Sequence, residues 1–403
     1  MNRILCINNI DDIKRELSRI GVSTQGIEAM SLKSTGIALK LKNIRIGAAN
    51  IIKQNMLSIG GDAAVSKGVV NGKKEISDVI ILGNISELQK LIDKLSYQDI
   101  FEIPEIRKNI KQLLNLYYYP KHNELNCRGY KFSLDKPLLM GILNITPDSF
   151  YDGNKYLNKE KALTHCEDMI KQGVDIIDIG GESTRPGAES VSITQEIDRV
   201  MPILEQIVKN FNVPVSIDTY KSEVAKIALE IGANMVNDIS ALTFDENMGK
   251  ILASYVDVPV VLMHIKGTPK NMQINPSYKD VIEEIMEFLD NAINRAKQFG
   301  IKDENIIIDP GIGFGKRLQD NITIIKKLAE FKPLDKPILV GTSRKSFIGH
   351  ILNLELEKRL TGTIAANLLC LINGANILRV HDITPHRHLI DFWQYFTNYN
   401  ITN

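Results

Sequence analysis

The sequence predicts an α/β protein in which a (β/α)8 TIM barrel follows a small α/β domain. Apolar runs of strand length recur about eight times after residue 135, helical patterns separate them, and a polar or glycine-rich segment follows each run. Continuous apolar runs are typical of parallel strands that are buried on both faces. About eight such units in roughly 265 residues favour a closed barrel over the alternative, an open doubly wound sheet.

The expected barrel strands are the apolar runs themselves. They span residues 138–143, 174–179, 213–217, 234–237, 258–263, 305–308, 337–340 and 375–380. The helical segments between them carry start and stop signals. The run Ser192-Ile-Thr-Gln195 has the spacing of a capping box. Glycines stand where helices are expected to end, at Gly173, Gly232, Gly300 and Gly374.

Residues 1–120 are predicted to form the small α/β domain, and residues 130–403 the barrel domain. The segment between about 118 and 130 interrupts the periodicity with a proline and polar residues, as a domain boundary does. Upstream of it we expect strands at 4–7, 37–41 and 79–82. A helix is expected to begin at the capping-box spacing of Asn84 and Glu87.

A glycine pair, Gly60-Gly61, is the most unusual feature of the first domain. It follows a helical pattern and precedes Asp62-Ala-Ala-Val65. Two interpretations are open: a loop that approaches a ligand, and a helix end followed by a tight turn, which we favour. The sequence indicates no activity for residues 1–120. We expect them to support oligomerisation or to cap the barrel.

Composition narrows the class of protein. The 403 residues are 44% hydrophobic and 24% charged, as in a globular chain with a buried core. Lys and Arg number 49 against 48 Asp and Glu, a balance that does not favour a nucleic-acid partner. No apolar run approaches the ~18 residues of a membrane span, so we expect no membrane partner and a cytoplasmic location. The cysteines, Cys6, Cys127, Cys166 and Cys370, are expected to be reduced thiols.

Charged and amide residues end several predicted strands, where the loops of a barrel form active sites. Asp218, Asn237 and Asp309 can pair with the donor and acceptor edge of a flat heterocycle, and Lys345 supplies a cation beside them. At the ends of the last and first strands, Arg379 and His381 with Asn144 can hold an anion or a metal-bound phosphate.

Each of these residues also has a purely structural interpretation. Asp218 can cap the next helix, and Arg379 can form a surface ion pair. His264 is by default a hydrogen-bonded structural histidine. The glycine-rich run 309–316 lacks the ending of a phosphate-binding P-loop because Arg317 follows Lys316, so a nucleotide hydrolase is not indicated.

Seven short motifs follow the predicted strands in order. They are Gly141-Ile-Leu-Asn-Ile-Thr-Pro-Asp-Ser-Phe150 with Asp152-Gly153, Gly181-Glu-Ser-Thr-Arg-Pro-Gly-Ala188, Ser216-Ile-Asp-Thr219, Val236-Asn-Asp-Ile239, residues 309–316, Thr342-Ser-Arg-Lys-Ser346 and Arg379-Val-His-Asp382. In this order they resemble the motifs of the dihydropteroate synthase family, over about residues 135–398. The resemblance implies a barrel fold and a homodimer.

The resemblance also implies a reaction and its Mg²⁺ cofactor. Members of this family join 4-aminobenzoate to 6-hydroxymethyl-7,8-dihydropterin diphosphate, release pyrophosphate and form 7,8-dihydropteroate for folate synthesis. Sulfonamides compete with the aminobenzoate. We expect an SN1-like substitution, in which diphosphate leaves before the neutral arylamine attacks, and in which closed loops exclude water from the pterin cation.

Roles for individual residues follow from the resemblance. The pterin is expected to contact Asp218, Asn237, Asp309, Phe314 and Lys345. The diphosphate is expected to contact Asn144, Arg379, Val380 and His381, with Asn144 also on the metal. The aminobenzoate is expected to contact Phe150, Thr184, Arg185, Pro186 and Ser346. The catalytic set is expected to be Asp218, Asp309, Lys345 and Asp152, the last supporting the metal or ordering its loop.

Two other functions compete with this one. A pterin-dependent methyltransferase on a related barrel would share the pterin carboxylates, but it needs no diphosphate clamp. A pterin-binding or scaffold protein with a decayed site would have lost motif residues, and every motif residue named above is present. Both alternatives are therefore less favoured than the synthase.

Overall fold

The structure is a computed structural model. It describes residues 3, 5, 7, 10–70, 72–118, 123–146, 155–185 and 187–398. The chain divides into two compact units, residues 1–119 and residues 120–403. Each unit is described by itself.

The first unit has a three-stranded antiparallel sheet with the strand order β1-β3-β2. Its elements are α1 (Ile10–Arg19), α2 (Thr24–Ser31), β1 (Gly36–Arg45), α3 (Ile46–Ser58), β2 (Asp62–Val65), α4 (Lys67–Val70), β3 (Ile76–Asn84), α5 (Ile85–Leu95) and α6 (Ile103–Tyr118). Burial alternates along β3, so one face of the sheet packs on the helices and the other is exposed. The unit thus has a hydrophobic core of its own, formed by strands and helices α3, α5 and α6.

The predictions for this unit were partly right. The capping box at Asn84 and Glu87 is present, and the strands expected at 37–41 and 79–82 lie within β1 and β3. Strand β2 follows the glycine pair and was not predicted. Residues 5 and 7 of the strand expected at 4–7 are not in a strand, and residues 4 and 6 lie outside the described part.

The glycine pair is explained by close packing. Gly60 has a φ of 95°, which favours glycine, and it follows the end of α3. A Cβ atom on Gly61 would lie 2.3 Å from Cε of Met56 and 2.9 Å from the carbonyl oxygen of Leu82. Helix α3 therefore ends in a tight turn into β2, which supports the structural interpretation of this motif.

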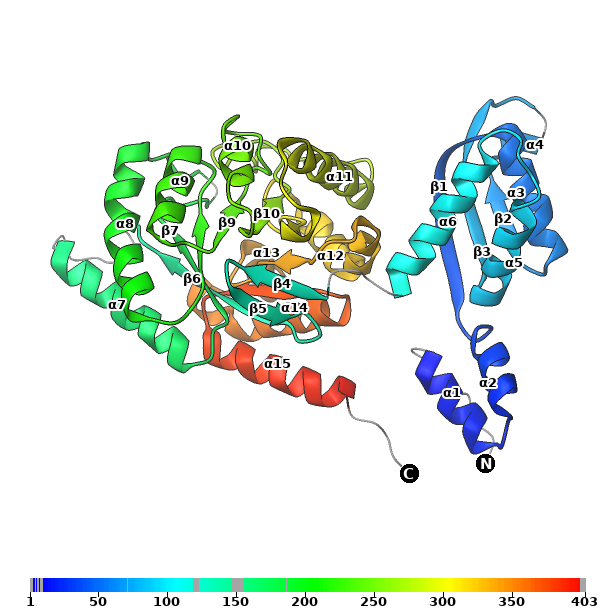
Figure 1. Cartoon of the computed structure of the whole chain (residues 1–403), viewed down its shortest axis with the longest axis horizontal. Helices are drawn as coiled ribbons and strands as arrows, with labels where there is room; N and C mark the ends of the chain where they lie inside the picture. The colour runs from blue at the N-terminus through cyan, green and yellow to red at the C-terminus, as the bar shows by residue number, and fades with distance from the viewer. Residues whose placement is uncertain are drawn as a thin grey trace. The chain divides into compact units, whose positions relative to one another are not determined.

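The second unit is an eight-stranded parallel barrel surrounded by helices (Figure 1). Its strands are β6 (Leu138–Asn144), β7 (Ile176–Gly180), β8 (Val215–Asp218), β9 (Met235–Asp238), β10 (Val260–Met263), β11 (Ile306–Asp309), β12 (Leu339–Val340) and β13 (Ile377–Val380). They are ordered β11-β10-β9-β8-β7-β6-β13-β12, and an isolated bridge between Ile308 and Ile338 joins the two ends. The predicted fold class is therefore confirmed, with a strand at each expected place.

Helices connect the strands in the order expected of a barrel. They are α7 (Lys155–Lys171), α8 (Ile193–Asn210), α9 (Ser222–Ile231), α10 (Met248–Ala253), α11 (Val281–Phe299), α12 (Leu318–Lys326), α13 (Ser346–Leu352), α14 (Leu360–Ile372) and α15 (Ile383–Asn398), with 3₁₀ turns η2 (Asp303–Asn305), η3 (Leu328–Leu334) and η4 (Leu356–Lys358). The glycines expected at helix ends all have positive φ values: Gly173, Gly232, Gly300 and Gly374. Ser192 and Gln195 form the predicted capping box of α8.

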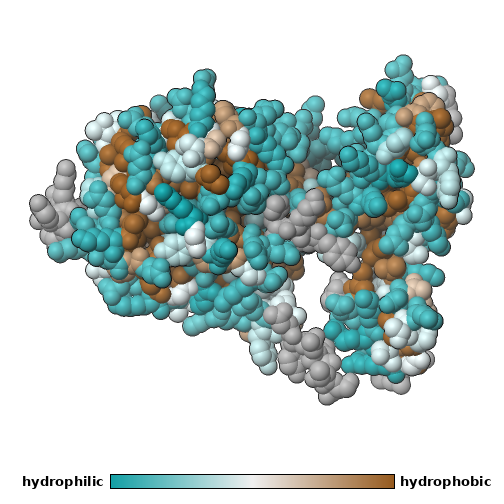
Figure 2. All heavy atoms as spheres, viewed as in Figure 1, coloured by the Kyte–Doolittle hydropathy of each residue, from teal (hydrophilic) through white to brown (hydrophobic). Residues whose placement is uncertain are grey.

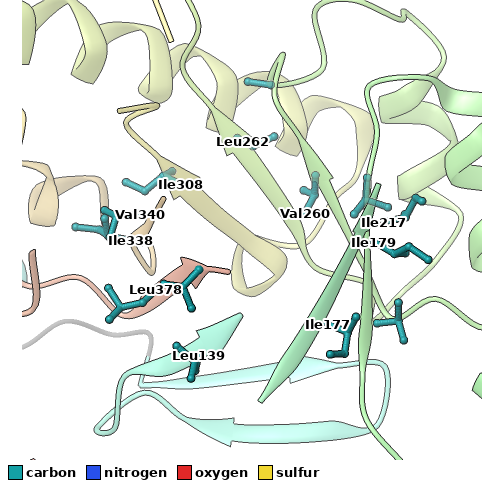
Figure 3. Packing of buried hydrophobic residues seen from close by; sticks show 14 of the residues in the cluster. Leu139, Ile177, Ile179, Ile217, Val260, Leu262, Ile308, Ile338, Val340 and Leu378 are labelled. Carbon is teal, nitrogen blue, oxygen red and sulfur yellow. The ribbon is translucent and has the colours of Figure 1, made fainter. Parts of the chain in front are cut away.

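The main core lies between the strands and the helices. Alternate strand residues point outward into it, among them Ile177, Ile179, Ile217, Leu262 and Leu378 (Figure 3). The residues between them point into the barrel, because successive side chains of a strand face opposite sides. Parity along each strand therefore decides which side chains line the interior.

The interior of the barrel is apolar near the amino-terminal ends of the strands. Inward side chains from the first half of the strands form one buried cluster, which contains Met140, Ile176, Met235, Val261, Ile307, Leu339 and Ile377. The hairpin of β4 (Glu124–Cys127) and β5 (Tyr130–Ser133) adds Leu125 and Cys127 to this cluster. We call these residues the floor of the barrel.

The surface is mostly hydrophilic over the barrel unit in the view of Figure 2, where hydrophobic residues show in patches. Among the described residues, every helix is too short or too polar to cross a membrane. The described cysteines, Cys127, Cys166 and Cys370, are buried free thiols. Burial raises the pKa of each of them to about 12, so they are protonated at neutral pH.

Candidate active site

Polar inward side chains lie above the floor, at the carboxyl ends of the strands. Asp178 is on β7, Asp218 on β8, Asn237 on β9, Asp309 on β11 and Arg379 on β13. The residue before each of them belongs to the core between the strands and the helices. Because successive side chains of a strand face opposite sides, all five polar side chains point into the barrel. We call this upper layer the mouth.

Arg379 is the centre of the mouth. Its Nε donates to Oδ2 of Asp178 at 2.6 Å, and its Nη2 donates to Oδ2 of Asp218 at 2.6 Å. Burial opposes the charge of the guanidinium, but the two carboxylates raise its pKa above the usual value. Nη1 has no hydrogen bond within the described part of the chain, so it remains available to a ligand. Arg379 therefore forms buried ion pairs, and the alternative of a surface ion pair is excluded.

Asp218 and Asn237 face the same space from adjacent strands, where they are register partners. Burial raises the pKa of Asp218 to about 7, while Arg379 opposes this shift and Asp178 adds to it. Nδ2 of Asn237 donates to Oδ2 of Asp178 at 3.1 Å. The mouth therefore presents a carboxylate and an amide side by side, which suits the edge of a heterocycle.

Asp309 ends β11, and Lys345 follows β12, the next strand of the barrel. Oδ1 of Asp309 accepts a hydrogen bond from the Gly311 amide at 2.7 Å, and burial raises the pKa of this carboxyl group. Burial lowers the pKa of Lys345 to about 8, and Asp309 opposes that shift. The Lys345 ammonium donates to the carbonyl of Ile312 and lies 4.6 Å from the ring centroid of Phe314.

The glycine-rich segment 309–316 wraps around a buried lysine. Nζ of Lys316 lies 2.9 Å from Nδ1 of His264 and donates to the Phe314 carbonyl at 3.0 Å. Burial lowers the pKa of Lys316 and brings that of His264 to about 2, with Lys316 adding to the effect on the histidine. His264 is therefore the structural histidine that we expected.

The residues expected to hold an anion lie at the ends of β6 and β13. Asn144 ends β6 and is half-buried. His381 follows β13, and its Nδ1 lies 2.9 Å from Oγ of Ser343. Burial lowers the pKa of His381 to about 4, and the charges of Arg379 and Arg185 act in the same direction. The Arg185 guanidinium therefore contributes to the lowered pKa of the His381 imidazole.

Not every expected site residue has its side chain in the mouth. The Val380 side chain is fully buried in the core between strands and helices, so the expected diphosphate contact of this residue would be made by its main chain. Ser346 is exposed at the first turn of α13. Thr184 is half-buried and Arg185 is exposed in the segment after β7. Phe150, Asp152 and Pro186 lie outside the described residues.

Asp178 and Ser343 are site residues that sequence reasoning missed. Asp178 is fully buried and pairs with Arg379, and it lies within the apolar run 174–179 that predicts a strand. A charged residue at an inward strand position was the signal, because a buried carboxylate requires a partner. Ser343 orients His381, and the sequence carried no separate signal for it.

The donor atoms at the mouth suit a metal ion that arrives with a substrate. Among the described residues there is no group of three His, Cys, Asp or Glu side chains that could hold a metal. Mg²⁺, however, commonly binds through one or two protein oxygens plus substrate phosphates and waters. The amide oxygen of Asn144 can serve as such a ligand.

Comparison with known proteins decides the family. A family model described as pterin binding enzyme matches residues 140–381, which is more than half of the chain. A dihydropteroate synthase from Clostridium beijerinckii is 49% identical over 250 residues, which are 62% of this chain and 90% of the relative. The chain belongs to the dihydropteroate synthase family of pterin-binding enzymes. The methyltransferase alternative is not favoured by these matches.

A solved structure agrees with this assignment. The dihydropteroate synthase of Xanthomonas albilineans with 4-aminobenzoic acid is 40% identical, and the match covers 70% of this chain and 100% of that one with a TM-score of 0.66. A probable bifunctional folylpolyglutamate synthase/dihydropteroate synthase of Halobacterium salinarum is 36% identical over 377 residues, 94% of this chain and 45% of the relative. The last match is longer than the barrel unit, so it includes residues of the first unit.

Proposed function

We propose that this protein joins 4-aminobenzoate to 6-hydroxymethyl-7,8-dihydropterin diphosphate and releases pyrophosphate and 7,8-dihydropteroate. The observation that carries the proposal is the mouth, where Arg379 holds two carboxylates and where Asn237, Asp309 and Lys345 face the same space. A flat, nitrogen-rich ring requires such a set of donors and acceptors. The reaction is a transfer of the pterin methylene group from diphosphate to an arylamine.

The pterin ring is held by Asp218, Asn237, Asp309 and Lys345, with Phe314 at its side. The carboxylates accept from ring N–H and amino groups, and the Lys345 ammonium donates to a ring acceptor. The same carboxylates favour positive charge on the ring. They therefore stabilise the cation that forms when the bond from the methylene carbon to the diphosphate oxygen breaks and the electron pair leaves with diphosphate.

The leaving group is held on the other side of the mouth. We assign it to Nη1 of Arg379, the imidazole of His381 and the main chain of Val380. Asn144 holds the Mg²⁺, which supplies charge neutralisation of the diphosphate when it is bound. This assignment of the metal is supported by the donor chemistry of Asn144 at the end of β6.

The arylamine nitrogen of aminobenzoate then forms the bond to the methylene carbon and afterwards loses a proton. Thr184, Arg185 and Ser346 are assigned to the aminobenzoate, and the exposed Arg185 guanidinium suits its carboxylate. Phe150 and Pro186 complete this half-site, and Asp152 supports the metal or orders its loop. Sulfonamides compete for the same half-site. The homodimer and the cytoplasmic location remain predictions.

The direct test is a coupled assay of the full-length protein with both substrates. We expect pyrophosphate and dihydropteroate in equal amounts, dependent on Mg²⁺ and inhibited by a sulfonamide in competition with aminobenzoate. In the variant Asp218→Asn, the rate of pyrophosphate release without aminobenzoate should fall by about a hundredfold, as for the loss of one preorganised electrostatic group. A wild-type rate in that variant would exclude the cation-stabilising role.

A further inference from the structure

A buried charge cluster lies beneath the segment that carries Thr184 and Arg185. Glu182 is two residues after the last residue of β7, and Ser183 to Arg185 follow it directly. The Glu182 side chain is 8% exposed. It is therefore a charged group placed in the protein interior immediately before the residues assigned to the aminobenzoate.

Glu182 is held by contacts on both of its carboxylate oxygens. Oε2 accepts from the Lys221 ammonium, and also from the backbone amide of Val191 at 3.4 Å. Oε1 accepts from the hydroxyl of Tyr220 at 2.9 Å. Val191 lies beyond the Thr184–Arg185 segment, so one side chain connects the chain before this segment with the chain after it.

Lys221 extends these contacts to helix α8. Its Nζ lies 2.5 Å from Oε2 of Glu196, whose side chain is 1% exposed, while the Lys221 side chain is 11% exposed. Tyr220 supports the same lysine, because Nζ lies 5.1 Å from the centroid of its ring. We call Glu182, Lys221 and Glu196 the clamp.

The main chain next to Glu182 is held as well. Nη1 of Arg199, on α8, donates to the Gly181 carbonyl at 2.9 Å. A Cβ atom on Gly181 would lie 2.7 Å from Cγ2 of Val200, so the chain passes close to α8 at this point. Gly181 is thus held directly on α8, and Glu182 is connected to α8 through Lys221 and Glu196.

Burying three charged groups is costly, and a hydrophobic cluster of the same size would stabilise the barrel at least as well. What these contacts supply instead is a fixed orientation, because Tyr220 holds Oε1 of Glu182 and Lys221 holds Oε2. A displacement of about 1 Å in a substrate-positioning segment can reduce a rate a hundredfold.

We propose that the clamp is a set of positioning residues for the aminobenzoate half-site: it fixes Glu182, and thereby sets where Thr184 and Arg185 meet the second substrate. The inference rests on the proposed function for the identity of that substrate. Glu182 directly precedes the Thr184–Arg185 segment, and its printed polar partners are Tyr220, Lys221 and Val191, none of which is assigned to the pterin. Lys221 also lies three residues after Asp218, and Glu196 raises the pKa of Asp218, so both substrates must be measured. We expect the larger effect on the aminobenzoate.

The test compares four variants of the full-length protein. Lys221→Met removes the cation of the clamp, and Lys221→Arg keeps it. Tyr220→Phe removes a single hydroxyl and leaves no unpaired charge. Lys226→Met is the matched control, because Lys226 pairs with Glu230 at 3.9 Å on the exposed face of the neighbouring helix α9.

We expect the KM for aminobenzoate to rise about tenfold or more in Lys221→Met and about threefold in Tyr220→Phe, with the KM for the pterin substrate changed less than about twofold. Lys221→Arg should restore most of the loss, and Lys226→Met should match the wild type. Amide hydrogen exchange of residues 181–192 should become faster in Lys221→Met, while exchange in β8 and β9 stays unchanged.

Two results would overturn the proposal. One is an unchanged KM for aminobenzoate in a folded Lys221→Met protein. The other is an equal rise of both KM values, which would make the clamp a support of the whole barrel mouth. If Lys221→Met does not fold, Tyr220→Phe decides by the same criteria. A wild type without dihydropteroate formation would refute the proposed function and the aminobenzoate role, and hydrogen exchange would still show whether the clamp holds residues 181–192.

Discussion

The two ends of the barrel interior are made by the same strands and have opposite chemistry. At the floor, Ile176, Ile307 and Ile377 are fully buried among other apolar side chains. Two residues further along the same strands and on the same face, the mouth has Asp178, Asp309 and Arg379. Strand parity therefore decides which residues face inward, while the identity of each residue decides whether that place stabilises the fold or binds a ligand.

The difference shows where the barrel can carry unfavourable charge. A buried carboxylate destabilises a folded protein unless it is paired. The apolar floor carries no such cost. In the mouth, the cost of burying two carboxylates is offset because Arg379 pairs with both of them. Substitutions at the two ends should accordingly separate stability from activity.

The largest effect is expected for Arg379→Met. It leaves Asp178 and Asp218, with side chains 0% and 9% exposed, without their cation. The free energy of unfolding should fall by ~3–5 kcal/mol, as for a broken buried ion pair. The value of kcat/KM should fall at least about a hundredfold. Urea unfolding and steady-state kinetics measure both.

Lys327→Met is the control for this change, because Lys327 pairs with Glu330 on the surface with both side chains about half exposed. It should cost less than ~1 kcal/mol and leave kcat/KM unchanged. Equal losses in the two variants would contradict the special role of the mouth.

The pH dependence of activity should come from the mouth. Burial raises the pKa of Asp218 to about 7 and lowers that of Lys345 to about 8. The carboxylate exists above the first value and the ammonium below the second, so kcat/KM for the pterin substrate should be greatest between them. It should fall about tenfold for each pH unit on either side. Lys345→Met should lose the alkaline limb, and a flat wild-type profile between about pH 6 and 9 would contradict the assignment.

A smaller effect is expected at the floor. Ile307→Val removes one methylene group from a fully buried position. The free energy of unfolding should fall by ~0.5–1.5 kcal/mol, and both KM values and kcat should remain those of the wild type. A change of kcat/KM beyond about twofold would show that the packing of the floor influences the geometry of the mouth.

The smallest effect is expected for Phe314→Leu. This variant removes the ring that lies 4.6 Å from the Lys345 ammonium. A cation–π contact of this kind contributes ~0.5–1 kcal/mol, so the KM for the pterin substrate should rise about two- to fivefold. Phe396→Leu, on the exposed face of α15, is the control and should have no effect. An unchanged KM in Phe314→Leu would remove Phe314 from the pterin site.

Much of the barrel could be predicted from the sequence because its signals are local. A parallel strand buried on both faces must be a continuous apolar run, and the eight runs found in this way correspond to β6 to β13. Helix ends at Gly232 and Gly300 and the capping box at Ser192 were also predicted, since each needs only a few neighbouring residues.

The remaining features depend on residues far apart in the chain. The pairing of Arg379 with Asp178 joins positions 201 residues apart, and neither residue alone indicates the other. The clamp joins Glu182 to Lys221 across 39 residues, and it was not predicted for the same reason. Strand β2 was missed because four residues after a glycine pair carry little periodicity.

The ring of strands has a seam. Strand β12 has only two residues, and β11 and β12 are joined by the isolated bridge between Ile308 and Ile338. Thermal opening of the ring should begin there, because a short strand and a single bridge are broken most easily. Asp309 ends the strand on one side of this seam, and Lys345 follows the strand on the other. A pterin bound to both residues would connect the strands on the two sides of the seam. Binding of the substrate would therefore stabilise the closed form of the barrel.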